Sequence, residues 1–287
     1  MKDEQWISAM RKYDGTTDFF NGGPNELSTL LREQTRKDRI RFASLIKVMP
    51  HDINPIYFSA ILDGLCGRYT NVPEEEKEEN DRSFNETPTE TFMTVIDRLH
   101  KLQGNPCGEA ICGNLKILAN KNLPPIVFEI VSYYAMRDPD PKEDIWRQTT
   151  HSGTYYGGSP HNHGMNSVRG KAAEAISAMI FHDYSRLDVL QVALVSLSED
   201  PVISVRTCAI EAFLPLLNCD RNLAVELFLV ACENCIEICA TSPFETFLRY
   251  AVFSHYKQLN RVHLETITFR NRSAKFQYLG GSTLAIV

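Results

Sequence analysis

The stretch that decides the fold reads NSVRGKAAEAI over residues 166–176, and a second version of it, ISVRTCAIEAF, covers residues 203–213. The two align with a constant shift of 37 residues, so that Arg169 meets Arg206. Self-similarity at such a period is typical of stacked repeats, in which one helical unit buries its apolar face only against its neighbours. The sequence therefore predicts an all-α solenoid of antiparallel helix pairs with long inserted loops.

The second copy has the periodicity of a helix packed on one side. Its apolar residues recur at steps of three and four and so share one stripe: Val202, Val205, Ala209, Ala212, Phe213 and Leu216. Asp200 and Pro201 stand just before it, where a carboxylate and a proline suit the first turn. The preceding segment, 187–197, also has an apolar face, so the two segments are predicted to form one helix pair joined by residues 198–201.

Asp200, Val205 and Arg206 have the spacing Asp-x4-Val-Arg, which resembles the signature of HEAT repeats. The resemblance implies that the Asp and the Arg form a ladder between neighbouring units while the Val packs inside. The first copy departs from this pattern, because His163 stands where the second copy has Asp200. The string from Asn166 to Ile176, after a loop rich in Gly, His and Tyr, also resembles the helical-repeat region of bacterial STAND-class antiphage ATP-binding proteins. That resemblance implies a sensor of a foreign protein, with the NTPase module elsewhere.

Charge and hydropathy exclude several classes of protein. The net charge of −6 argues against a nucleic-acid partner, which requires clustered Lys and Arg. The sequence has no run of about 18 apolar residues, so no membrane span is expected. The first residues lack the apolar region of a secretory signal. We therefore expect a cytoplasmic protein, and we expect its eight cysteines to be mainly buried small hydrophobic residues.

The chain divides into three predicted regions. Residues 1–140 form an N-terminal helical region, with helices expected near 26–36, 37–48 and 55–65 and an acidic insertion loop at 69–88. This loop lacks apolar residues over 73–81, which favours a solvated segment, or else an acidic docking segment for a basic partner. Residues 141–166 form a Gly/His/Tyr-rich loop, and 167–287 form the HEAT-like repeat region. The apolar residues at the end of the sequence suggest a piece of a longer chain.

The candidate partner-binding residues lie in and beside the Gly/His/Tyr-rich loop: Tyr155, Tyr156, His161, Asn162, His163 and Arg169. Tyr, His and Arg are residue types from which binding hot spots are often built. The alternative is structural: the loop folds back as a cap, and Arg169 belongs to an interhelical ladder.

Three further motifs contain residue types that could carry chemistry. His151, His161 and His163 could ligate a metal ion, but the favoured interpretation is that they are ordinary loop histidines that cap the following helix. Cys232, Cys235 and Cys239 are predicted to share one face of a helix over 223–239 and to pack in the core, without zinc-finger spacing. Gly164, Gly170 and Lys171 differ from a P-loop in their spacing and lack the Ser or Thr after the Lys.

No catalytic signature or cofactor motif was identified, so the sequence favours a non-catalytic recognition or scaffold module. Its expected partner is a protein or another domain of the same polypeptide. A structural spacer between domains and an enzyme of unrecognised type remain alternatives.

Overall fold

The computed structural model describes residues 1–15, 22–151 and 153–260. These residues are mostly helical, which confirms the predicted all-α class, and the one sheet among them has two short strands. The chain forms two compact units, Met1–Val127 and Phe128–Val287. The division falls inside a helix, earlier than the boundary expected after residue 140. The part of the predicted repeat region that follows residue 260 lies outside the described residues.

The first unit contains seven α-helices among its described residues: α1 (Asp3–Lys12), α2 (Pro24–Lys37), α3 (Arg39–Val48), α4 (Pro55–Cys66), α5 (Lys77–Glu86), α6 (Thr89–His100) and α7 (Gly108–Ile117). Local signals set several boundaries. The carboxylate of Asp38 accepts a hydrogen bond from the Arg41 amide at the start of α3, and Asn54 caps α4 in the same way. Gly67 ends α4 in the left-handed conformation that glycine adopts without strain.

Packing in the first unit follows two rows of helices. α2 packs on α4 and α4 on α7, while α3 packs on α6. Members of the two rows also meet, since α3 contacts α4 and α6 contacts α7. Large apolar side chains fill the space between them, with Leu31, Tyr57, Phe58 and Phe92 fully buried.

The acidic segment was predicted wrongly as a solvated loop. Residues Glu74–Glu76 form a 3-10 turn and residues 77–86 form helix α5. None of these residues is buried, so the composition argument was correct about burial and wrong about order. The segment is held by arginines that lie about 40 positions earlier in the chain, such as Arg36, which pairs with Glu76.

The second unit begins within α8 (Pro125–Arg137) and continues with six more α-helices among its described residues: α9 (Pro160–Met165), α10 (Val168–His182), α11 (Leu187–Ser198), α12 (Ile203–Phe213), α13 (Arg221–Cys232) and α14 (Ser242–Ala251). α10 and α12 are the two copies of the repeat. α10 packs on α12 and α12 on α14, while α11 packs on α12 and α13. The stripe predicted on the second copy is buried throughout, from Val202 to Leu216.

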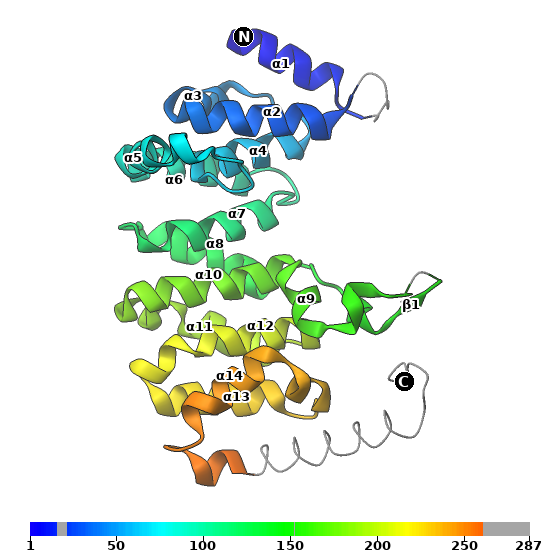
Figure 1. Cartoon of the computed structure of the whole chain (residues 1–287), viewed down its shortest axis with the longest axis vertical. Helices are drawn as coiled ribbons and strands as arrows, with labels where there is room; N and C mark the ends of the chain where they lie inside the picture. The colour runs from blue at the N-terminus through cyan, green and yellow to red at the C-terminus, as the bar shows by residue number, and fades with distance from the viewer. Residues whose placement is uncertain (16–21, 152, 261–287) are drawn as a thin grey trace. The chain divides into compact units, whose positions relative to one another are not determined.

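The segment 141–166 was predicted as a loop, and the structure shows several short elements there. A 3-10 turn covers Ile145–Arg147, and strands β1 (Thr149–Thr150) and β2 (Gly153–Thr154) pair antiparallel. A second turn, Tyr155–Gly158, leads into α9. In Figure 1 the hairpin projects away from α10 and α12. A serine and a proline of this segment start a helix, because Ser159 caps α9 and Pro160 occupies its first position.

None of the described helices combines the length and the apolar character needed to cross a bilayer.

Candidate binding surface

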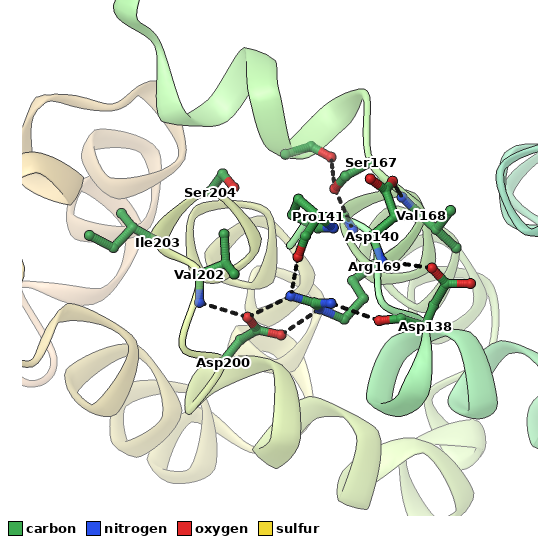
Figure 2. Close-up of polar contacts among 12 residues, drawn as sticks. Asp138, Asp140, Pro141, Ser167, Val168, Arg169, Asp200, Val202, Ile203 and Ser204 are labelled. Atoms are coloured by element: carbon green, nitrogen blue, oxygen red, sulfur yellow. Dashed lines mark hydrogen bonds and ion pairs between the residues drawn. The ribbon is translucent and has the colours of Figure 1, made fainter. Parts of the chain in front are cut away.

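Arg169 lies at the base of the candidate surface, in the first turn of α10, and its guanidinium joins three segments of the second unit (Figure 2). Nε donates to Oδ2 of Asp200 at 2.8 Å and Nη2 donates to Oδ1 at 3.2 Å. Nη1 donates to the carbonyl of Asp138 at 2.7 Å, and Nη2 also donates to the carbonyl of Pro141 at 2.8 Å. The side chains of Arg169 and Asp200 are only 11% and 7% exposed. We call these four residues the arginine node.

The node connects the two copies of the repeat. Arg169 belongs to the first copy, and Asp200 lies in the connection between α11 and α12, just before the second copy, so the ion pair joins the two copies. Asp200 also accepts a hydrogen bond from the Val202 amide at 2.8 Å, beside the start of α12. Arg206, the second copy's equivalent of Arg169, donates instead to the carbonyls of Ala231 and Glu233.

The residues after α8 supply carboxylates to two helix N-termini. Asp140 accepts from the Val168 amide at 2.8 Å, at the start of α10. Asp144 accepts from the amides of Ile203 and Ser204, both at 3.0 Å, at the start of α12. Backbone amides of a first helical turn have no partner within the helix, and the dipole there favours negative charge. These contacts fasten the segment that leads into the hairpin.

Helix α9 carries the two histidines, and they have different environments. His161 is partly exposed, and its Nε2 lies 3.3 Å from Oε2 of Glu211 on α12. His163 is buried, and its ring lies 5.0 Å from that of Tyr156 between centroids. Burial lowers the pKa of His163, while Asp144 and Asp140 act in the opposite direction. His163 therefore packs beneath the exposed residues and supports Tyr156.

Close backbone packing explains Gly164 and Gly170, the two glycines whose spacing differs from that of a P-loop. A Cβ on Gly164 would lie 2.3 Å from the carbonyl oxygen of Ser204, so α9 can approach α12 only with glycine there. A Cβ on Gly170 would meet the Gly164 carbonyl oxygen at 1.9 Å. Lys171 is buried and donates to the carbonyl of Met165 at 2.8 Å. All three residues serve the junction of α9, α10 and α12.

Two tyrosines and an asparagine remain at the surface of this region. Tyr155 is 46% exposed and Tyr156 is 36% exposed, and Asn162 is exposed on the first turns of α9. Tyr156 has a φ of 52°, a left-handed conformation that is costly for a bulky residue, and Gly157 and Gly158 follow it in the same region. We call Tyr155, Tyr156 and Asn162, with His161 at the edge, the tyrosine surface.

The structure thus separates the six predicted binding residues. Four of them form the tyrosine surface, whereas Arg169 and His163 lie beneath it. The buried position of Arg169 is the one that the structural alternative expected. The partner-binding role of the other four stays a prediction.

Sequence reasoning missed the carboxylates that organise this site. No capping or pairing role was predicted for Asp138, Asp140, Asp144 or Glu211. A usable signal was present, because acidic residues that lie just outside helices are often caps. Which helix each one would cap depended on the tertiary fold.

The metal and cysteine hypotheses have separate outcomes. Among the described residues no group of three or more His, Cys, Asp or Glu side chains could hold a metal ion. The predicted single helix over 223–239 was wrong, because α13 ends at Cys232 and Asn234 takes a left-handed φ of 54°. Cys235 and Cys239 are nonetheless buried, and burial raises the pKa of the Cys235 thiol to about 11.

A cavity of ≈ 610 Å³ in the first unit is relevant to the alternative hypothesis that the chain is an enzyme of unrecognised type. Its size lies within the range of small-molecule sites, and its lining includes Asp14, His51, Asp52 and Lys101. Both ring nitrogens of His51 lie near Nη1 of Arg98, at 3.1 and 2.6 Å. Arg98 also donates to the carbonyl of Met49, so this histidine sits beside a guanidinium anchored to the backbone.

No protein-family model, curated protein or solved structure matches the chain.

Proposed function

We propose that this chain is a non-catalytic recognition module of HEAT-like stacked helix pairs. In this proposal the tyrosine surface binds a protein partner or another domain of the same polypeptide. A cytoplasmic location stays a prediction from the sequence.

The order of helix contacts supports the stacked-pair architecture. In the second unit α10, α12 and α14 pack in succession, and α11 packs on α13, so alternate helices of the chain form two rows. The first unit has the same alternation, with α2, α4 and α7 in one row and α3 and α6 in the other. The Arg169–Asp200 pair is the kind of ladder contact that the HEAT resemblance implies.

One observation supports the recognition role above the others. The charged side chains of the second unit near this site bind partners within the unit, while two adjacent tyrosines stay exposed. Arg169, Asp140 and Asp144 all bind within the second unit. Tyr155 and Tyr156 combine a large apolar ring with a hydroxyl group at low conformational cost, which suits them to binding. A surface held by a rigid frame loses little entropy when a partner docks.

The resemblance to STAND antiphage proteins extends the proposal to a biological setting. The module would sense a foreign protein, and an NTPase outside these 287 residues would respond. This part of the proposal rests on the sequence string at 166–176 alone.

The experiment compares Tyr155→Ala/Tyr156→Gly with the wild-type chain by cross-linking in the producing cells, followed by mass spectrometry. Glycine at 156 keeps the left-handed backbone without strain while removing the ring. A matched control is Tyr250→Ala, because Tyr250 is also exposed and lies on α14 of the same unit. If either Tyr155 or Tyr156 is a binding hot spot, removal of its ring costs about 2 kcal/mol of binding free energy, which lowers the affinity for the partner by roughly 30-fold.

The expected result is loss of the cross-linked partner in the double variant alone, with the melting temperature nearly unchanged. A partner set that survives the double substitution would refute the recognition role and favour a spacer. A large fall in melting temperature would show that the tyrosines serve chiefly as a cap on the helical frame.

A further inference from the structure

Residues 74–86 of the first unit form an inserted element that belongs to neither row of helices. They lie between α4 and α6 in the chain and carry seven acidic residues against two basic ones. No residue of this segment is buried. We call it the acidic segment. Its order therefore comes from side-chain contacts with the rest of the unit.

Two buried arginines at the junction of α2 and α3 bind side chains of the acidic segment. Arg36 is 6% exposed, and its Nη2 donates to Oε2 of Glu76 at 2.8 Å. Arg39 is 3% exposed, and it donates to Oδ1 of Asn80 and to Oγ of Ser83, both at 2.8 Å. Its Nε is fixed by the carbonyl of Leu65 at 2.9 Å, so the guanidinium is already oriented.

An aromatic contact completes the attachment. Phe84 meets Phe92 of α6 edge to face, with ring centroids 5.5 Å apart. The ammonium of Lys121 lies 4.5 Å from the centre of the Phe84 ring, and Arg39 lies 5.9 Å from it. A cation over an aromatic face at these distances is attractive. We call Arg36, Arg39, Lys121 and Phe92 the basic groove.

The contacting residues follow a helical spacing. Glu76, Asn80, Ser83 and Phe84 stand at i, i+4, i+7 and i+8, which places them along one face. The groove therefore matches one side of a helix that carries an acid, two short polar acceptors and an aromatic residue.

The groove requires acceptors whichever segment supplies them. Burial lowers the pKa of Arg39, and the nearby positive charge of Arg36 lowers it further. Burial also opposes the charge on Arg36, but its hydrogen bonds to Glu76 and Glu33 outweigh this and raise its pKa. When the segment leaves, Arg36 keeps Glu33 and Arg39 keeps the Leu65 carbonyl, but both guanidiniums lose the acceptors that the segment supplied. A similar helix can replace these charge-assisted hydrogen bonds, so a vacated groove favours its capture.

We propose that the basic groove is a binding site for an acidic, aromatic-bearing helix of a partner protein, and that the acidic segment occupies it as a tethered competitor. The segment is suited to displacement, because an element without buried residues opens at a lower free energy than the core helices. The groove lies in the first unit and does not depend on the tyrosine surface of the second.

The tether determines how strongly the acidic segment competes with a free helix for the basic groove. A segment joined by short connections has an effective concentration of about 1 mM. A free peptide with an intrinsic Kd of about 10 μM would then bind the closed protein roughly 100-fold more weakly than the opened protein.

The test uses a fluorescent peptide with the sequence of residues 73–88 and measures its anisotropy against the full chain. The opened variant is Glu76→Ala/Phe84→Ala, which removes one ion pair and the aromatic contact but leaves the groove intact. The matched control is Glu75→Ala/Glu79→Ala, because these two exposed acids of the same segment make none of the contacts described above. Circular dichroism monitors folding of every variant.

The opened variant should bind the peptide at least about tenfold more tightly than the wild type and the matched control. A peptide that carries the same two alanines should not bind, and adding Arg36→Gln/Lys121→Gln to the opened variant should abolish binding. A folded opened variant that fails to bind would overturn the proposal. Amide exchange in 77–86 as slow as in α4 of the wild type would also overturn it, because the segment would then not open separately.

Discussion

Asp200→Ala is the substitution whose effect the second unit defines most clearly. The alanine removes the carboxylate that receives two hydrogen bonds from Arg169, at 2.8 and 3.2 Å, and one from the Val202 amide at 2.8 Å. The guanidinium cannot turn to solvent without releasing the carbonyls of Asp138 and Pro141. The variant is therefore left with a buried cation that lacks its counter-ion.

The size of the loss follows from these contacts. Breaking a buried ion pair by removal of one partner costs about 3–5 kcal/mol. The two carbonyl acceptors that Arg169 keeps place the expected value near the lower end, and the lost bond to Val202 adds about 1 kcal/mol. We expect Asp200→Ala to reduce the free energy of unfolding by about 3–4 kcal/mol. Asp200→Asn keeps the shape but exchanges charged for neutral acceptors, so it should cost about 1–2 kcal/mol.

A double-mutant cycle separates the ion pair from the other contacts of both residues. Arg169→Met leaves the Asp200 carboxylate and two carbonyls without their donor, so it should also be strongly destabilising. The double variant no longer contains an unpaired charge, and it should be less destabilised than the sum of the single variants by about 2–3 kcal/mol.

The assay is urea unfolding followed by tryptophan fluorescence. The chain has two tryptophans, Trp6 in the first unit and Trp146 in the second. A Trp6→Phe background leaves Trp146, which is buried beside Asp144 near the arginine node, as the reporter of the second unit. A loss below about 1 kcal/mol for Asp200→Ala, the range of exposed ion pairs, would refute the reasoning, as would a coupling energy near zero.

Three further predictions concern the same unit. Gly164→Ala should destabilise the unit by about 1–3 kcal/mol, because the added methyl group would overlap the backbone of α12. Thermal unfolding measures this loss. Gly15→Ala is the control, because a Cβ added there has open space. Asp144→Ala should cost about 1–2 kcal/mol in urea unfolding, since it removes the cap of two amides at the start of α12, and an unchanged midpoint would contradict the capping role. Burial lowers the pKa of His163, so the unfolded chain takes up this proton more readily than the folded chain. Stability should therefore fall as the pH drops from about 6.5 through the folded pKa; His163→Gln should flatten this slope in urea titrations, and an identical slope would contradict the assignment.

The sequence predicted most of the helices that lie in the described part of the chain, and it failed where order depended on distant partners. The segments expected at 26–36, 37–48 and 55–65 correspond to α2, α3 and α4 with boundaries close to those observed. Helix α5 was missed because its stabilising arginines lie elsewhere in the chain. The break after Cys232 was missed because the apolar pattern continues through it, and the signal was a single asparagine that tolerates the left-handed conformation.

The candidate site shows the same division. Composition singled out the Gly/His/Tyr-rich region, and the structure places two exposed tyrosines and a partly exposed histidine there. Composition could not indicate that His163 and Arg169 would be buried while Tyr155 stayed exposed. Burial of a side chain depends on which helix passes over it, and α9 is positioned by contacts with α12.

The sequence by itself determined the helical class, the periodicity of the repeat and the stripe of small and apolar residues that α12 buries. These features are local, since steps of three and four along one helix define a face regardless of what covers it. Only the tertiary structure decided that Arg169 of one copy pairs with Asp200 of the next, and that the acidic segment is held by Arg36 and Arg39. Charged side chains separated by 30 to 40 residues have many possible partners along a chain, and only the packing of the intervening helices brings one of them within hydrogen-bonding distance.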